Sequence, residues 1–373
     1  MSRFRRKNAQ IEKFIQFGGM AAAILFAAST LPTGNTLRAA DHNEFNEKGN
    51  IVIADQFNNR VIEVDPATHD VVWTFGDGSD KPGPHSIVGT NDAERVGEFT
   101  LISGTGTPPG LPGCSNTVNG CPDNRVIVVD ENGHIVWQYG QDAGVSGAGP
   151  DQLNTPVAAT FLPNGHILIT DQVNERVIEV NRKKEIVWQY GVTGLAASGF
   201  DELNNPNSAE LLENGHILIA DENNNRAIEV DRQFNIIHTF TAGGTVSGVA
   251  FASRLENGNT LITDSNNNRI VEVDANDSIE WQYSTNTDPA SNPTPLPTRA
   301  VRLRNGNTLI SDQFNDRVIE VDHDKNVVFT QGDLNNPGNG SDQLNGPYDA
   351  KVVGDFTGLT RPPKLEGDDF SGE

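Results

Sequence analysis

The residues best suited to chemistry are charged side chains that flank one alanine of a repeated segment. Asp92, Arg299 and Asp349 stand immediately before this alanine, and Glu94, Glu210 and Lys351 stand immediately after it. Carboxylates confined beside cations can bind a cation or a small polar ligand, or can titrate at shifted pH and act as acids and bases. A solvated channel lined by internal ion pairs is the alternative interpretation.

Two more polar side chains, Asn207 and Tyr348, stand two positions before the same alanine and extend this candidate ligand site. The alanine recurs without gaps in six aligned segments, at Ala93, Ala159, Ala209, Ala252, Ala300 and Ala350. A small residue at this position is expected if six strands crowd around a common axis. The charged neighbours differ between the six copies, so the predicted site breaks the symmetry of the repeat.

Histidine is the side chain most often used as a general base or proton shuttle near neutral pH. Of the eight histidines, His85 is the best placed to face such an axis, because it lies just before the first of the aligned segments. If the chain is an enzyme, His85 and Arg299 are its candidate catalytic residues. The identity of any cofactor is open, and a Ca ion in the central channel is the one that an acidic lining could hold. The D-x-N-x-N segments at residues 221–225 and 264–268 are weak calcium motifs, because Arg replaces the Gly that the loop needs.

The elements that position these residues come from a repeat that dominates the chain. From Arg125 onward, the Arg of a D-x-x-N-x-R-like segment recurs at intervals of 43–51 residues, and most copies carry an Asn-Gly hairpin turn. Each copy reads as four short strands, which is the pattern of a propeller blade. The first copy lacks a good first strand, and residues 347–353 supply an extra one. The sequence therefore predicts an all-β, six-bladed β-propeller over residues 41–356, closed by pairing of the C-terminal strand with the N-terminal blade.

The two ends of the chain have different compositions from the repeats. Residues 1–40 combine a basic start with a short Ala/Gly-rich apolar run, so we expect a signal peptide, with an uncleaved anchor as the alternative. Residues 357–373 are acidic and contain Pro and Gly, and are expected to form a disordered tail. Export would place the chain in the periplasm, the cell envelope or the medium, where Cys114 and Cys121, the only cysteines, should form a disulfide.

The charge of the chain narrows the range of partners. Fifty Asp and Glu against 27 Lys and Arg give a formal net charge of −23. Nucleic acid requires a basic surface, and an anionic membrane also favours one, so we expect no nucleic-acid partner and no membrane contact beyond the export signal. The expected partner is a small polar ligand or an extracytoplasmic protein or peptide, bound by a monomer.

The D-x-x-N-x-R-V/I segments, such as residues 55–61 and 312–318, resemble the NHL repeat. The blade sequence NGNTLI…NNRIVEV…WQY also resembles bacterial arylsulfotransferase-type propellers. This resemblance covers residues 44–353 and implies the propeller fold, but NHL-type propellers include binding modules as well as enzymes. The arylsulfotransferase type uses a channel histidine with further His and Arg residues, and only His85 and Arg299 could be matched to that set.

These observations predict an exported binding module that uses the face with the longer loops. An enzyme with its site at the channel mouth is the alternative, most concretely a sulfuryl transferase and otherwise a lyase or hydrolase. The insertion that carries the two cysteines is predicted to be either a lid over the channel or a stapled surface loop.

Overall fold

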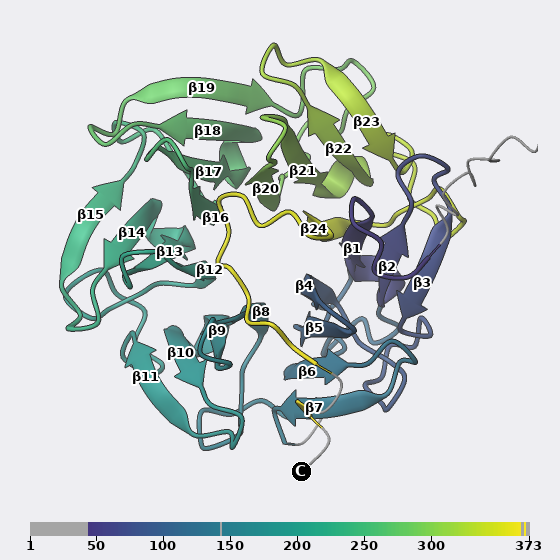
Figure 1. Ribbon diagram of the computed structural model, residues 1–373, viewed down its shortest axis with the longest axis horizontal. Helices are drawn as coiled ribbons and strands as arrows, with labels where there is room; N and C mark the ends of the chain where they lie inside the picture. Colours follow the sequence, from purple (N-terminus) through teal and green to yellow (C-terminus); the bar gives the residue numbers. More distant parts are fainter. Residues whose placement is uncertain (1–43, 142–143, 367–368, 371–373) are drawn as a thin grey trace, which may run out of the picture. The chain divides into compact units, whose positions relative to one another are not determined.

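The repeat folds as six antiparallel sheets of four strands each, arranged as blades around an axis in the computed structural model (Figure 1). The structure describes residues 44–141, 144–366 and 369–370, so the predicted signal peptide lies outside the described residues. No helix in these ranges is long and apolar enough to cross a membrane. The prediction of an all-β, six-bladed propeller is confirmed.

Blades 1 to 3 contain the following strands, written from the axis outward. Blade 1 has β24 (Pro347–Val352), β1 (Ile51–Asp55), β2 (Arg60–Val64) and β3 (Val71–Phe75). Blade 2 has β4 (Thr90–Val96), β5 (Phe99–Gly104), β6 (Arg125–Val129) and β7 (Ile135–Tyr139). Blade 3 has β8 (Pro156–Phe161), β9 (Ile167–Asp171), β10 (Arg176–Val180) and β11 (Ile186–Tyr190).

Blades 4 to 6 repeat the same order. Blade 4 has β12 (Pro206–Leu211), β13 (Ile217–Asp221), β14 (Arg226–Val230) and β15 (Ile236–Phe240). Blade 5 has β16 (Val249–Arg254), β17 (Thr260–Asp264), β18 (Arg269–Val273) and β19 (Ile279–Ser284). Blade 6 has β20 (Arg299–Arg302), β21 (Thr308–Asp312), β22 (Arg317–Val321) and β23 (Val327–Gln331).

The ring closes at blade 1, as the sequence predicts. β24 pairs antiparallel with β1, and Ala350 lies opposite Ile53 in the register. The first strand of blade 1 therefore comes from the end of the chain and its other three strands from the beginning. This arrangement ties the two ends of the propeller together through backbone hydrogen bonds.

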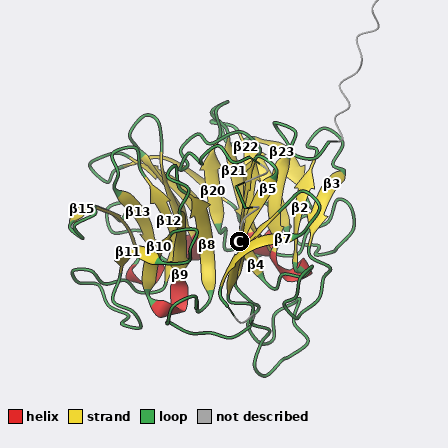
Figure 2. Cartoon of the chain, turned by 60° about the horizontal axis from the view of Figure 1, so that its bottom comes forward, coloured by secondary structure: helices red, strands yellow, loops and turns green. Residues whose placement is uncertain are grey.

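Antiparallel connections give the propeller two distinct ends. The hairpin face carries the turns between the first and second strands, such as Asn257-Gly258, where Gly258 takes the positive φ that such a tight turn requires. The loop face carries the connections between blades and five 3-10 helices (Figure 2). These helices are η1 (Gln56–Asn58), η2 (Gln172–Asn174), η3 (Glu222–Asn224), η4 (Ser265–Asn267) and η5 (Gln313–Asn315).

The repeated Asp and Arg are structural, as their repetition on several blades predicts. In blade 4, Asp221 Oδ2 accepts a hydrogen bond of 2.7 Å from Arg226 Nε, and its Oδ1 accepts one of 2.8 Å from the backbone N–H of Asn204. The same carboxylate thus joins the turn between two strands to the connection from the previous blade. Blade 3 repeats this arrangement with Asp171 and Arg176.

The segment after β24 differs from the expected disordered tail. Residues 353–366, called the C-terminal strap below, run across the hairpin face along the inner strands (Figure 1). The backbone N–H of Leu211 in β12 donates a hydrogen bond of 2.9 Å to Thr360 Oγ1, and Leu359 packs on the core of the blades. Beyond the strap, Phe370 packs 4.8 Å from Phe99, centroid to centroid. Composition alone misleads here because a few apolar residues dock the segment.

Candidate functional site

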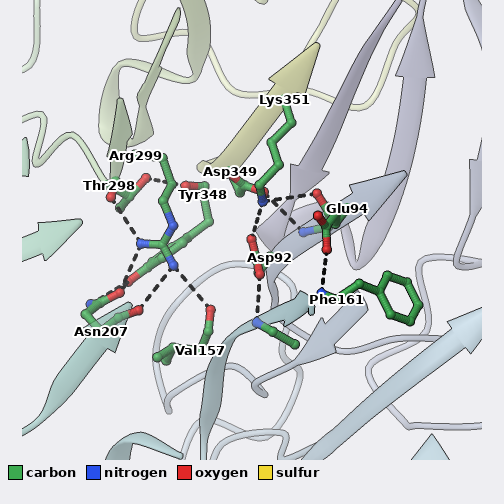
Figure 3. A network of polar contacts seen from close by, with 12 residues as sticks. Asp92, Glu94, Val157, Phe161, Asn207, Thr298, Arg299, Tyr348, Asp349 and Lys351 are labelled. Carbon is green, nitrogen blue, oxygen red and sulfur yellow. Dashed lines mark hydrogen bonds and ion pairs between the residues drawn. The ribbon is translucent and has the colours of Figure 1, made fainter. Parts of the chain in front are cut away.

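The inner strands bring the predicted polar residues to the axis in two groups (Figure 3). One group, the lysine cluster, consists of Asp92 and Glu94 from β4 with Asp349 and Lys351 from β24. The other group, the arginine plug, consists of Arg299 from β20, Asn207 from β12 and Tyr348 from β24. All of these side chains are buried or nearly so.

The lysine cluster is a closed ion-pair arrangement. The Lys351 ammonium lies 2.5 Å from Asp92 Oδ1 and 2.5 Å from Asp349 Oδ2. The carboxylates also accept hydrogen bonds from neighbouring inner strands: Asp349 from the N–H of Ala93 at 3.2 Å, and Asp92 from the N–H of Ala159 at 2.8 Å. The cluster therefore joins three successive inner strands, β24, β4 and β8.

Burial and pairing set opposite pKa shifts within this cluster. Burial alone would raise the pKa of Asp92, but the cations Lys351 and Arg299 bring it below its usual value. Burial raises the pKa of Asp349 to about 6 even though Lys351 opposes the change. Burial works against the charged form of Lys351, but Asp349 and Asp92 outweigh it and raise its pKa. Lys351 is thus held as a cation.

The arginine plug crosses the axis and contacts four inner strands. Arg299 Nη1 donates hydrogen bonds to Asn207 Oδ1 at 3.0 Å and to the carbonyl of Ala250 at 3.1 Å, and Nη2 donates to the carbonyl of Val157 at 3.3 Å. Its Cζ lies 5.1 Å from the centroid of Tyr348, and Phe251 lies at a similar distance. One guanidinium therefore joins its own blade to four of the other five blades.

The space left at the axis is very small. The cavity beside the two groups has a volume of about 20 Å³, with Leu359 and Thr360 of the C-terminal strap among its lining residues. A single water molecule needs roughly 10–15 Å³ by this kind of measure, so the cavity has room for no more than one or two waters. A substrate the size of a sugar or an aryl group does not fit between these side chains. The charged side chains compensate one another and hold the inner strands together at the axis, and they leave no open site.

Two carboxyl groups of the cavity are not paired with a cation. Glu94 accepts one hydrogen bond of 2.9 Å from the N–H of Phe161, and burial raises its pKa to about 8. Glu210 lines the same cavity, and no described residue donates a hydrogen bond to it. Burial raises the pKa of Glu210 well above its usual value. Burial thus favours the protonated form of both side chains, which lowers the cost of burying them.

The sequence missed the polar residues that close the axis near the loop face. Gln56 Nε2 donates a hydrogen bond of 2.7 Å to Asn91 Oδ1, and Gln313 Nε2 donates one of 2.7 Å to Gln56 Oε1. Asn207 Nδ2 donates to Glu222 Oε2 at 2.8 Å. Gln56, Glu222 and Gln313 each open a 3-10 helix, directly after the repeated Asp. Their fixed position directly after the repeated Asp is the sequence signal that identifies these three residues.

The structure does not bring the two candidate catalytic residues together. His85 is exposed in a turn before β4, and the flanking carbonyls of Gly83 and Ser86 accept hydrogen bonds from Arg125. Arg299 is buried at the axis. No histidine is among the residues that line the axial cavity. The pair therefore has no geometry for nucleophilic transfer in this structure.

The described residues contain no group of three or more His, Cys, Asp or Glu side chains that could hold a metal ion. The Lys351 ammonium occupies the position between Asp92 and Asp349, where a cation bound by the predicted acidic lining would be expected. Calcium in the central channel stays a prediction, and the charge that would attract it is largely compensated by the chain itself.

Cys114 and Cys121 form the predicted disulfide, with their Cα atoms 5.6 Å apart. The insertion that carries them is attached to the loops of blade 1: Asn59 Nδ2 donates a hydrogen bond of 2.7 Å to the carbonyl of Gly113, and the backbone N–H of Ser115 donates one of 2.9 Å to Asp80. Of the two predicted alternatives, a lid over the channel or a stapled surface loop, these contacts match the surface loop.

No protein-family model and no curated protein sequence matches the chain. Among solved structures, a protein of unknown function from Bacteroides caccae has a TM-score of 0.52 and 15% identity, over 76% of this chain and 93% of that chain. Virginiamycin B lyase from Staphylococcus aureus has a TM-score of 0.46 and 12% identity, over 75% and 83% of the two chains. A streptogramin B lyase has a TM-score of 0.47 and 11% identity, over 76% and 83%. At these identities the likeness concerns the fold alone.

Proposed function

We propose that the chain is an exported NHL-type propeller that acts as an extracytoplasmic binding module through its loop face. The axis argues against a catalytic channel, because Arg299, Lys351 and their partners fill it and leave only about 20 Å³. A surface interaction remains the function that best fits a rigid ring with a closed centre. The loop face is favoured because propeller loops vary independently of the scaffold that holds them.

The observation that carries the proposal is the distribution of exposed apolar side chains. Outside the edge strands of the blades, every large hydrophobic residue that is strongly exposed in the described chain lies on the loop face. Phe200 is 67% exposed, and Val118 is 79% exposed. The full set on this face is Val118, Val145, Val173, Val192, Leu195 and Phe200.

Five of these six residues lie on loops that are bonded to one another, which makes a shared surface between blades 2 and 4. Asn174 of η2 donates a hydrogen bond to the carbonyl of Gly147 at 2.8 Å and accepts one from the N–H of Gly194 at 2.9 Å. The loops carrying Val145, Val173 and Phe200 are thus tied together. We call Val145, Val173, Val192, Leu195 and Phe200 the apolar loop patch. Exposed apolar residues gathered on one face are typical of protein or peptide binding sites.

A capture experiment with matched variants tests this proposal. The purified chain, the double variant Leu195→Asp with Phe200→Asp, and the control Val187→Asp with Val328→Asp are immobilised and exposed to an envelope extract of the source organism. The control residues are also exposed apolar side chains, but they lie on the outer strands β11 and β23. We expect a specific protein that binds the wild type and the control and is lost with the loop variant.

The proposal fails if the loop variant retains every protein that the wild type captures. It also fails if nothing binds the wild type above the bare resin. Circular dichroism of the variants shows whether a lost interaction comes from the surface change or from unfolding.

A further inference from the structure

A large groove on the hairpin face, opposite the apolar loop patch, is not explained by the proposed function. Its volume is about 760 Å³, and its walls come from the turns that follow β4, β16 and β20 and from the C-terminal strap. Residues 95–96 of β4 line this groove, whereas Asp92 and Glu94 of the same strand line the axial cavity. The groove therefore lies next to the closed axis, in the size range of small-molecule sites.

The groove is basic, although the chain as a whole carries a formal charge of −23. Four exposed cations line it, against two carboxylates. The cations are Lys48, Arg304, Arg361 and Lys364, and the carboxylates are Glu256 and Glu366. Arg95 also lines it but is already paired with Glu63 at 2.9 Å. Four neighbouring positive charges on an acidic protein create a local field of the opposite sign to that of the whole molecule.

These four cations are unusual in having no partner within the described chain. The side chains of Lys48, Arg304, Arg361 and Lys364 form no ion pair or hydrogen bond with any described residue. Only Lys81, Lys183 and Lys325 share that property among the described Lys and Arg residues. Every other described guanidinium or ammonium binds an acceptor, as Arg302 does with Glu272 at 2.9 Å. Unpaired cations are thus concentrated in this one groove.

The groove also offers an apolar wall. Phe356, Pro362, Pro363 and Leu365 of the C-terminal strap line it together with the four cations. The strap is fixed over the inner strands through Thr360, and the backbone N–H of Arg304 donates a hydrogen bond of 2.9 Å to Asp355. The same strap therefore shapes the groove and carries both its apolar residues and two of its four cations, Arg361 and Lys364.

We propose that this groove binds a small organic anion that has at least two negative charges and an apolar body. The unpaired Lys and Arg side chains would receive the charges, with charge-assisted hydrogen bonds from the guanidinium groups. Phe356 and the two prolines would cover the apolar part. This site lies on the opposite face from the proposed binding surface, so it would give the propeller a second, independent ligand.

The test uses naphthalene trisulfonate as the probe, because it combines three negative charges with a flat apolar body. Calorimetry at low ionic strength measures its affinity for the full chain, for Arg304→Gln with Lys364→Gln, and for Lys183→Gln with Lys325→Gln. The last pair is a matched control, since it removes the same charge from unpaired lysines outside the groove. We expect the groove variant to bind about tenfold more weakly or worse, and the control to change less than about twofold.

Two further probes separate the charge from the apolar contribution. Inorganic phosphate should bind more weakly than the trisulfonate, and uncharged naphthalene methanol should not compete with it. The proposal is overturned if the trisulfonate shows no saturable binding, or if the two double variants weaken it equally. It is also overturned if naphthalene methanol displaces the probe, because the site would then be apolar rather than anion-selective.

Discussion

At the residue scale, Arg299 determines whether the axis of the propeller is open or closed. Its guanidinium donates to Asn207 Oδ1 and to the carbonyls of Ala250 in β16 and Val157 in β8, and it is almost fully buried. Arg299→Met would leave these acceptors unpaired and remove a cation that stabilises Asp92. We expect a loss of about 3–5 kcal/mol in the free energy of unfolding, measured by urea denaturation.

The exposed Arg304 provides the control for this measurement. Arg304→Met removes the same charge without a buried partner and should change stability by less than about 0.5 kcal/mol. A loss below about 1 kcal/mol for Arg299→Met would mean that the arginine plug is not a structural element.

The buried Glu94 predicts how stability depends on pH. Its pKa is raised to about 8 in the folded chain, from the ordinary value of 4.5. Between these values the unfolded chain has lost the proton and the folded chain keeps it. The stabilisation from Glu94 is therefore complete below pH 4.5 and is lost as the pH rises to about 8, with a slope of up to about 1.4 kcal/mol per pH unit.

Urea midpoints between pH 5 and 8 test this dependence. The urea midpoint of Glu94→Gln should fall less steeply with rising pH than that of the wild type. The midpoint of Glu256→Gln, at an exposed turn, should follow the wild type. The midpoint of Glu94→Gln should still fall somewhat with rising pH because of Glu210, whose pKa is also raised. Parallel curves for the wild type and Glu94→Gln would show that Glu94 is ionised in the folded chain.

The sequence predicted the members of the axial groups but not their roles. The six-fold alanine register was enough to bring Asp92, Asp349 and Lys351 to one place, because equivalent positions of a repeat meet at the axis. It could not show that Lys351 satisfies both carboxylates, since side-chain direction depends on the register between blades. The position of His85 is set by an irregular turn before β4, to which the repeat gives no guide.

At the element scale, the disulfide offers a local test of the insertion in blade 2. Cys114 and Cys121 close a short loop that is held to blade 1 by Asn59 and Asp80. The chain-entropy model assigns about 2.5 kcal/mol to a loop of this length. Replacing both cysteines by serine should therefore cost at most about 2.5 kcal/mol and leave the strand content in circular dichroism unchanged.

A larger loss of stability in the double serine variant, or loss of cooperative unfolding, would show that the insertion is part of the propeller core.

The strand pattern itself was predictable because each blade repeats the same turns and apolar strands. The C-terminal strap was not, since its docking depends on Leu359, Thr360 and Leu365 meeting blades that are distant in sequence.

At the scale of the whole molecule, closure of the ring depends on the last strand. Truncation after Gly346 removes β24, which leaves β1 paired only with β2, as an edge strand at the axis, and removes Lys351 from the lysine cluster. We expect this chain to lose cooperative thermal unfolding. Truncation after Asp355 keeps β24 but removes most of the C-terminal strap, and it should fold with a lower melting temperature. If both truncated chains melted like the full chain, strand exchange between the termini would not hold the ring together.

The central proposal is that a propeller with a closed axis binds its partner through the surface of its loops. Site-specific photo-crosslinking in the source organism tests this claim most directly, with a photoreactive amino acid placed at Phe200 or, as an equally apolar exposed control, at Val328. We predict a discrete crosslinked species from Phe200 that is absent from Val328. Equal crosslinking from both positions, or none from Phe200, would contradict the assignment of the loop face as the binding surface.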